Sequence, residues 1–192
     1  MQSPSTSLRT GTTSKLSRQR ERFLQGLLGP ARRVAARYGL PVSVMLAQAA
    51  LESNWGRSRL ARVARNLFGI KAVSRHAEAV TLPTCEYNGR RRASPKNAGG
   101  RMLAARFAAY ASVEDCLGDY ARLLAFAPRY AAARAVADDP FAFAEQLAAC
   151  GYATDPGYGK KICALMRRYE LTRFDSERVQ STSSGLEAGG NK

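Results

Sequence analysis

The residue with the clearest chemical potential is Glu52, which ends a nearly apolar stretch that begins at Pro41. A long apolar run opened by proline predicts a buried helix, with Glu52 at its carboxyl end. Burial disfavours the charged form of a carboxyl group, and the negative end of the helix dipole disfavours it again. Both effects raise the pKa, as a general acid working near neutral pH requires. The structural alternative is an ion pair with Arg59, Arg62 or Lys71.

Acid-assisted cleavage of a glycosidic bond needs a second group across that bond, most often another carboxylate. Glu86 is the best candidate, because it lies on the alternating, β-like segment 81–87. Glu78 and Asp119 are the other options. The structural alternative for Glu86 is a solvated strand charge that faces the arginines at 90–92.

Polar and aromatic residues around Glu52 are candidates for substrate contacts. Gln48 precedes Glu52 by one helical turn, so the two side chains share a face. Sugars stack on aromatic rings, although aromatic residues at these spacings also build cores. The aromatic candidates are Trp55, which is the single tryptophan, and Tyr87, Tyr110, Tyr152 and Tyr158.

Other chemistries have little support in the sequence. It contains no phosphate-binding glycine motif of the Walker or dinucleotide type. His76 is the single histidine, and the four cysteines form no CxxC or Cys/His cluster, so we do not expect a zinc site. A disulfide between Cys150 and Cys163 stays open, because it depends on how the flanking helices pack.

The composition points to an anionic partner. The chain has 30 Lys and Arg residues against 15 Asp and Glu residues, a formal net charge of +15. Nucleic acid, a membrane surface or an acidic cell-wall polymer would suit this charge. The alternative is that the arginines lie on solvent-exposed surfaces and bind no partner. No recognised DNA-binding motif accompanies the basic residues, so specific nucleic-acid binding is not expected. No apolar run is long enough for a transmembrane helix, and no standard secretory signal opens the chain.

The pattern predicts a mainly helical α+β domain at residues 19–174, between disordered tails at 1–18 and 175–192. A β-like segment, the Asn88-Gly89 turn signal and a weaker strand at 102–110 predict one small hairpin. The predicted helices cover about 20–28, 30–39, 41–52, 58–65, 112–126, 139–151 and 155–171, with punctuation by proline, glycine and capping residues.

Six segments in order resemble glycoside hydrolase family 73, the bacterial N-acetylglucosaminidases, which include the peptidoglycan-hydrolase domain of the flagellar rod-cap protein. They are 47–58 (AQAALESNWGRS), 66–72 (NLFGIKA), 84–87 (TCEY), 119–124 (DYARLL), 128–131 (PRYA) and 151–156 (GYATDP). The resemblance runs from about residue 30 to 168. It implies a lysozyme-like fold in which a helical lobe and a small β-lobe flank a cleft.

The resemblance also implies hydrolysis of the β-1,4 bond after N-acetylglucosamine in peptidoglycan strands. Glu52 matches the family's general acid, Glu86 the β-lobe glutamate, and Tyr152 a tyrosine near the scissile sugar. Glu86 would act as a base, a nucleophile helper or a stabiliser of a substrate-assisted path. The candidates for substrate binding are Gln48, Trp55, Asn66, Phe68, Tyr87 and Tyr158.

One departure from the family pattern lies at Arg75-His76-Ala77, where the family often has Trp-Gly. The resemblance implies that no cofactor is required. We expect a monomer that is cytoplasmic before export and acts in the periplasm or extracellular cell wall, after export by a route other than a standard signal peptide. Alternatives are cleavage of the muramidase or lytic transglycosylase type on the same fold, or a wall-binding module without catalysis.

Overall fold

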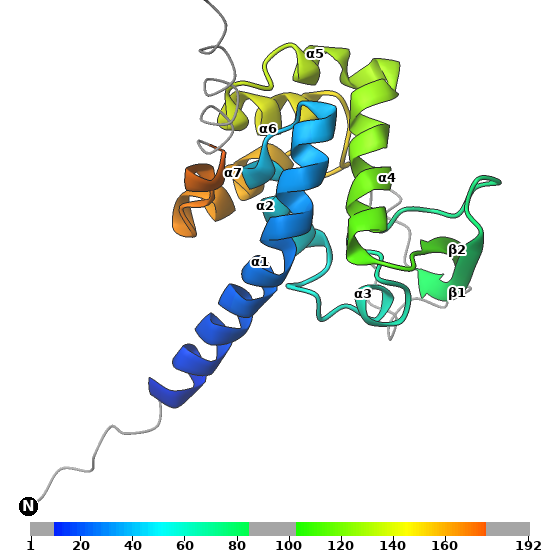
Figure 1. Ribbon diagram of the computed structural model, residues 1–192, viewed down its shortest axis with the longest axis horizontal. Helices are drawn as coiled ribbons and strands as arrows, with labels where there is room; N and C mark the ends of the chain where they lie inside the picture. Colours follow the sequence, from blue (N-terminus) through cyan, green and yellow to red (C-terminus); the bar gives the residue numbers. More distant parts are fainter. Residues whose placement is uncertain (1–9, 85–102, 176–192) are drawn as a thin grey trace, which may run out of the picture.

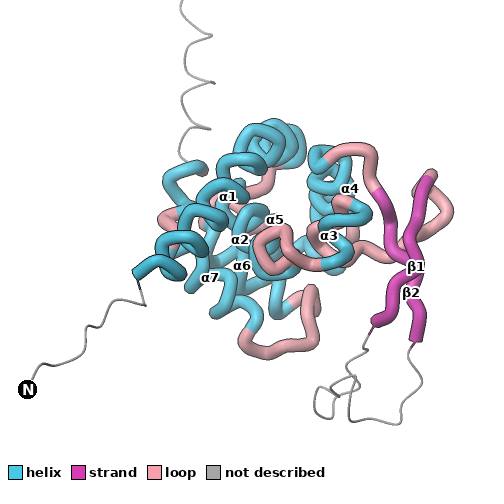
Figure 2. Tube along the Cα trace, turned by 90° about the horizontal axis from the view of Figure 1, so that it is seen from below, coloured by secondary structure: helices cyan, strands magenta, loops and turns pink. Residues whose placement is uncertain are grey.

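The computed structural model describes residues 10–84 and 103–175 of the 192-residue chain. Its helices form one body, and a two-stranded antiparallel hairpin extends from one side of that body (Figures 1 and 2). The predicted α+β class with a predominance of helix is therefore confirmed.

Helix α2 (Val42–Glu52) lies at the centre of the helical body. All of its residues from Val42 to Ala50 are buried, because the helix is apolar on nearly every side. Its neighbours are α1 (Thr10–Tyr38), α6 (Pro140–Ala149), α7 (Tyr158–Arg168) and η2 (Leu171–Phe174). The predicted core helix that ends at Glu52 is confirmed.

Helix α1 is longer and more continuous than the sequence predicted. The sequence indicated a disordered segment up to residue 18 and a break at Gly29-Pro30, whereas one helix runs from Thr10 through Pro30 to Tyr38. Proline normally excludes helical geometry at the preceding residue by a clash with its Cβ, and Gly29 has no Cβ. Leu27, Ala31 and Val34 are buried on both sides of Pro30, so packing holds the two halves in register.

Helix starts follow the predicted capping residues closely. Ser112 and Asp115 form a reciprocal capping box at α4 (Val113–Phe126), and the side chain of Asp139 caps α6 before Pro140. The short helix α3 (Arg59–Ala64) begins after Ser58, whose hydroxyl accepts the amide hydrogen of Ala61.

The region around the last helix differs from the prediction. Asp155 forms a local turn with its carboxylate on the amide of Gly157, so α7 begins only at Tyr158. The short helices η1 (Pro128–Tyr130) and α5 (Ala131–Arg134) were not predicted. Both belong to an alanine-rich connection that has no strong periodicity.

The hairpin consists of β1 (Glu78–Thr84) and β2 (Leu103–Ala109). Glu78 pairs with Ala109 and Thr84 with Leu103. Strand β2 lies within the predicted segment 102–110, whereas β1 begins before the predicted segment 81–87. Leu82 and Phe107 are buried, and α3 contacts both strands. The predicted turn at Asn88-Gly89 lies outside the described residues.

Two smaller expectations concern cysteines and membranes. Cys116, Cys150 and Cys163 are free thiols, so Cys150 and Cys163 do not form the disulfide that the sequence left open. In the described ranges, no helix has both the length and the apolarity to cross a bilayer.

Candidate active site

Glu52 is the last residue of α2, and a tight turn follows it directly. Asn54, Trp55 and Gly56 have φ angles of 51°, 58° and 73°, so the chain reverses in the left-handed region. The hydroxyl of Ser53 donates to the carbonyl of Ala49 and accepts the amide hydrogen of Gly56, which closes the turn. The turn fixes where α2 ends and places Glu52 at the protein surface. The residue as a whole is exposed, but its carboxyl group lies among protein atoms and accepts a hydrogen bond from Tyr158.

A directional chain of hydrogen bonds leads from the core to this carboxylate. The Tyr120 hydroxyl donates to Oε1 of Gln48, and Nε2 of Gln48 donates to the Tyr158 hydroxyl at 2.8 Å. The Tyr158 hydroxyl then donates to Oε1 of Glu52, also at 2.8 Å. Gln48, Tyr120 and Tyr158 are all buried. Each donor therefore points toward Glu52, and the chain joins helices α4, α2 and α7.

The protonation state of Glu52 reflects two opposing effects. Burial of the carboxyl group among protein atoms raises its pKa, and the hydrogen bond from Tyr158 lowers it; burial is the larger effect, so the pKa of Glu52 lies above its ordinary value. Burial also raises the pKa of the Tyr158 phenol far above its usual range, so this residue stays a neutral donor. Within residues 10–84 and 103–175, no lysine or arginine forms an ion pair with Glu52, which argues against the structural alternative of Arg59, Arg62 or Lys71.

Tyr152 belongs to the same cluster. Its ring stacks on Tyr158 with a centroid distance of 5.4 Å, and it lies 6.4 Å from Tyr120 and 6.2 Å from Tyr130. The turn after α6 positions it, with Gly151 at φ 75° and the Tyr152 amide bonded to the carbonyl of Leu147. Predicted residues from two distant segments thus meet around Glu52.

Phe68 packs behind this cluster. Its ring stacks on Tyr120 at a centroid distance of 4.0 Å, and the residue is buried. Phe68 therefore contacts Tyr120, the first member of the hydrogen-bonded chain, from the protein interior. The sequence analysis placed this residue among the candidates for substrate binding.

The structure places Trp55 and Asn66 away from the Glu52 cluster. The Trp55 ring packs edge-on against Phe23 and Tyr169, at centroid distances of 6.1 and 4.7 Å. The side-chain amide of Asn66 donates to the carbonyls of Ile70 and Ala108 and accepts the Ile70 amide hydrogen, so its polar atoms hold backbone. These contacts indicate packing and loop-fixing roles, and the sugar contacts of the two residues stay predictions.

The three candidates for the second carboxylate differ in their positions. Glu86 and its neighbour Tyr87 lie outside the described residues. Glu78 is exposed at the start of β1. Asp119 accepts hydrogen bonds from three side chains; burial opposes its ionisation, but these bonds prevail and hold its pKa below the ordinary value. In the described part of the chain, no three His, Cys, Asp or Glu side chains come together as metal ligands.

Tyr120 is the site residue that sequence reasoning missed. It lies on the apolar face of α4, where a tyrosine has the same pattern as any core residue. Its position directly after Asp119 in the resembling segment 119–124 was the available signal.

A family model and several known proteins match this chain. The model of the family described as "Glucosaminidase: Mannosyl-glycoprotein endo-beta-N-acetylglucosaminidase" matches residues 29–171. The peptidoglycan hydrolase FlgJ of Salmonella typhimurium is 36% identical over 178 residues, which cover 88% of this chain and 51% of that protein. The exo-glucosaminidase LytG of Bacillus subtilis is 31% identical, with 86% and 57% covered. The chain thus spans little more than half the length of these relatives.

A solved structure extends the similarity to three dimensions. The catalytic domain of the autolysin Auto from Listeria monocytogenes superposes with a TM-score of 0.69 at 32% identity, and the match covers 90% of this chain and all of that domain. The family match spans most of the sequence and includes Glu52, Tyr120, Tyr152 and Tyr158. The chain therefore belongs to the glucosaminidase family.

Proposed function

We propose that the protein is a peptidoglycan hydrolase that cleaves the β-1,4 bond after N-acetylglucosamine, with Glu52 as the general acid. The observation that carries this proposal is the carboxyl group of Glu52, which lies at the end of a core helix, has a raised pKa, and has one oxygen held by Tyr158. Such a group is protonated more readily than an ordinary glutamate and has a fixed orientation.

The two carboxyl oxygens of Glu52 have different tasks in this proposal. Oε1 accepts the hydrogen bond from Tyr158, so the acidic proton resides on Oε2, which faces the glycosidic oxygen of the bound strand. As the bond breaks, the proton moves to the leaving oxygen and Glu52 becomes negatively charged. The Tyr158 hydroxyl then stabilises that charge without transferring its own proton, because its pKa is far too high.

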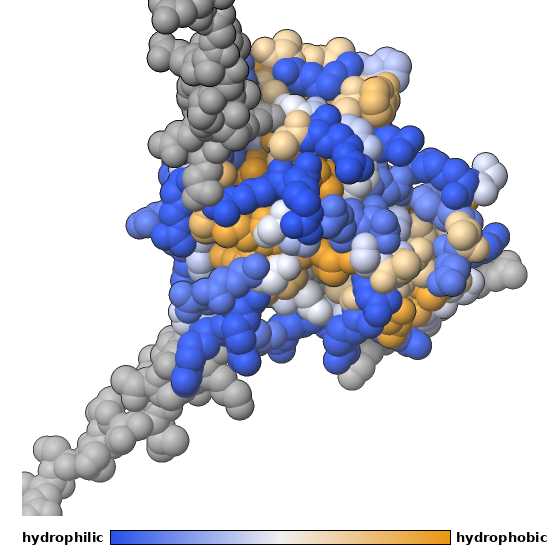
Figure 3. All heavy atoms as spheres, in the orientation of Figure 1, coloured by the Kyte–Doolittle hydropathy of each residue, from blue (hydrophilic) through white to orange (hydrophobic). Residues whose placement is uncertain are grey.

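The second group is proposed to be Glu86, which stabilises the developing positive charge on the sugar or activates water. Tyr152 is proposed to lie near the scissile sugar, since its ring stacks on the tyrosine that binds Glu52. The proposed substrate carries free carboxylates on its peptides, which suits a net charge of +15. Hydrophilic residues cover much of the face seen in Figure 3, including α1. The proposed place of action is the cell wall, in the periplasm or outside the cell.

The decisive experiment is digestion of purified sacculi by the wild type and by Glu52→Gln. The variant removes the acidic proton and keeps the shape, so release of soluble fragments should fall by at least about 100-fold. Glu145→Gln is the matched control, because Glu145 is exposed on α6 and should leave the rate unchanged. A Glu52→Gln variant that digests sacculi as fast as wild type would refute the assignment.

Mass spectrometry of borohydride-reduced products identifies the bond that is cut. A reduced N-acetylglucosamine end supports the proposal. A reduced N-acetylmuramic acid end would indicate a muramidase, and an anhydro end a lytic transglycosylase. Binding to sacculi without any released fragment would indicate a wall-binding module.

A further inference from the structure

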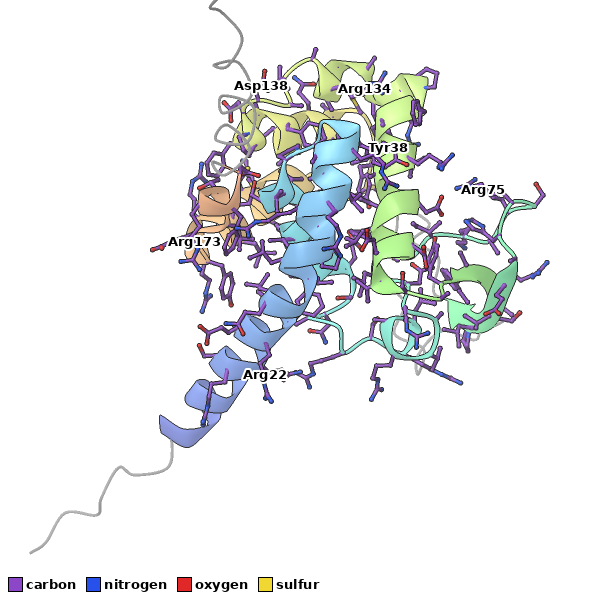
Figure 4. All side chains as sticks on the ribbon, viewed as in Figure 1. Arg22, Tyr38, Arg75, Arg134, Asp138 and Arg173 are labelled. Atoms are coloured by element: carbon purple, nitrogen blue, oxygen red, sulfur yellow. The ribbon has the colours of Figure 1, made fainter. Side chains whose placement is uncertain are left out.

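One carboxylate on α4, that of Asp119, contacts side chains from the segment that enters β1 and from the segment that leaves β2. Before β1, Arg75 donates from Nη2 to Oδ1 of Asp119 at 2.8 Å, and His76 Nε2 lies 2.8 Å from Oδ2. After β2, the hydroxyl of Tyr110 donates to the same Oδ2 at 2.8 Å. Arg75 projects from the segment before β1 toward α4 (Figure 4). Hydrogen bonds to Asp119 thus connect the segments that flank the hairpin, before β1 and after β2, to the helical body.

The backbone fixes the proton position on His76. Nδ1 of the ring accepts the amide hydrogen of Val73 at 2.9 Å, so a neutral ring carries its proton on Nε2 and donates it to Asp119. The side chains of His76 and Asp119 are only 7% and 11% exposed, whereas that of Arg75 is 54% exposed. The inner part of the cluster is shielded from water, which makes its hydrogen bonds stronger than surface contacts.

Asp119 is unsuited to act on a substrate directly. Both of its oxygens are occupied, Oδ1 by Arg75 and Oδ2 by His76 and Tyr110. It borders a hollow of about 680 Å³ between α1, α4 and residues 75–77, and Glu52 is not among the residues that line this hollow. The carboxylate therefore holds structure and has no free position for activating water.

The next residue on α4 links this cluster to the acid. Tyr120 begins the hydrogen-bonded chain that ends at Glu52, and it follows Asp119 directly. The first turn of α4 is itself fixed by the capping box of Ser112 and Asp115. A single rigid helix thus carries both the anchor of the hairpin and the start of the chain to Glu52.

We propose that Asp119 is a positioning residue that sets where the β1–β2 hairpin stands relative to Glu52, through Arg75, His76 and Tyr110. This inference rests on the proposed function, because it assigns the hairpin a part in the reaction. Glu86, the proposed second carboxylate, follows the end of β1 by two positions in the sequence, so the position of β1 bears on the proposed pairing with Glu52. Misplacement of a reacting group by about 1 Å can lower a rate by roughly 100-fold.

The test compares Asp119→Asn with Glu114→Gln. Glu114 lies on the same helix and pairs with Arg33 of α1, so it controls for loss of a carboxylate that does not touch the hairpin. Two quantities are measured in each variant: kcat on soluble glycan strands, and hydrogen exchange of the amides in β1 and β2. Asp119→Asn should lower kcat by roughly 10- to 100-fold and speed exchange in the hairpin, while exchange in α2 and α7 stays as in wild type.

Three results would overturn the proposal. The first is an unchanged kcat in Asp119→Asn. The second is a lower kcat without faster hydrogen exchange in the hairpin, which would indicate that Asp119 takes part in the chemistry itself. The third is an equal effect of Glu114→Gln on kcat and exchange. If Asp119→Asn does not fold, His76→Gln and His76→Ala replace it. The glutamine variant keeps a donor toward Asp119 and should retain more of the rate than the alanine variant; equal rates would refute the proposal. Activity that survives Glu52→Gln would refute the proposed function while leaving the exchange result intact.

Discussion

The hydroxyl of Tyr158 lies 2.8 Å from Oε1 of Glu52, although the two residues are 106 positions apart in the sequence. This bond joins the end of one helix to the start of another, and it opposes the effect of burial on the acid. The balance between the two effects can be shifted by single substitutions, with consequences for activity and stability that can be measured.

Removal of the hydroxyl in Tyr158→Phe should raise the pKa of Glu52 further. The bond stabilises the carboxylate, so its loss leaves burial unopposed. A general acid with a higher pKa stays protonated to higher pH, and the alkaline limb of the kcat–pH profile should move upward. At the optimum, kcat should fall by roughly 10- to 100-fold, because a hydrogen bond to the charged product form contributes about 1.5–3 kcal/mol.

The control for this change is Tyr169→Phe. The Tyr169 hydroxyl accepts a hydrogen bond from Arg20 and, in the part of the protein that the structure describes, makes none to the Glu52 chain. Its loss should leave the alkaline limb in place. A limb that moves downward in Tyr158→Phe would contradict the assigned role of the bond.

Glu52→Gln should stabilise the fold more at pH 7 than at pH 4. A carboxyl group whose pKa is raised by folding binds its proton more tightly in the native state, so stability falls as pH rises from the unfolded pKa through the folded pKa. Glutamine has no charge to bury and can still accept the hydrogen bond of Tyr158. Thermal unfolding of both proteins at the two pH values checks this, and a larger gain at pH 4 would contradict it.

The turn after Glu52 should not tolerate a side chain at Gly56. This residue has a φ of 73°, and a Cβ there would meet ring atoms of Phe23 at 3.0 Å. Gly56→Ala should therefore lower the free energy of unfolding by about 2–3 kcal/mol, from backbone strain and the steric conflict together. Urea denaturation measures the change.

Gly69→Ala is the matched control for that substitution. Gly69 has a similar φ of 70°, but no atom lies within 4 Å of the position that a methyl group would take there. The substitution should cost about 1 kcal/mol, from the backbone alone. Equal losses at the two sites would show that the contact with Phe23 adds nothing.

Trp55→Phe separates packing from sugar binding. The ring contacts Phe23 and Tyr169, and the guanidinium of Arg20 lies 5.2 Å from its centroid. The substitution should lower the free energy of unfolding by about 1–2 kcal/mol and leave KM for glycan strands unchanged. A raised KM with unchanged stability would instead support the sugar contact that the sequence predicted.

Local signals in the sequence predicted much of the helical frame. The apolar run up to Glu52, the Ser112–Asp115 capping box and the Asp139-Pro140 start each act within a few residues, and each appears in the structure. The break expected at Gly29-Pro30 failed for a physical reason. The glycine removes the clash between the proline ring and the Cβ of the preceding residue, and core packing on both sides favours continuity.

Interactions between distant segments could not be predicted from local patterns in the sequence. Gln48 and Glu52 were expected to share a face, but their partners Tyr120 and Tyr158 come from two other helices. A tyrosine that donates to a buried amide has the same local pattern as one that only fills the core. Asn66 shows the opposite case, because a polar residue in a resembling motif turned out to hold the backbone of Ile70 and Ala108.

The amide of Gln48 decides the sense of the hydrogen-bonded chain. Its oxygen accepts from Tyr120 and its nitrogen donates to Tyr158, so the remaining proton of Tyr158 is directed at Glu52. A half-turn of this one amide would set its oxygen against Tyr158 and draw that proton inward. The carboxylate would then face a lone pair, which repels it. The orientation of one buried amide therefore determines whether Tyr158 presents a hydrogen atom or a lone pair to Glu52. The packing around Gln48, which fixes that orientation, thus stabilises the carboxylate at the other end of the chain.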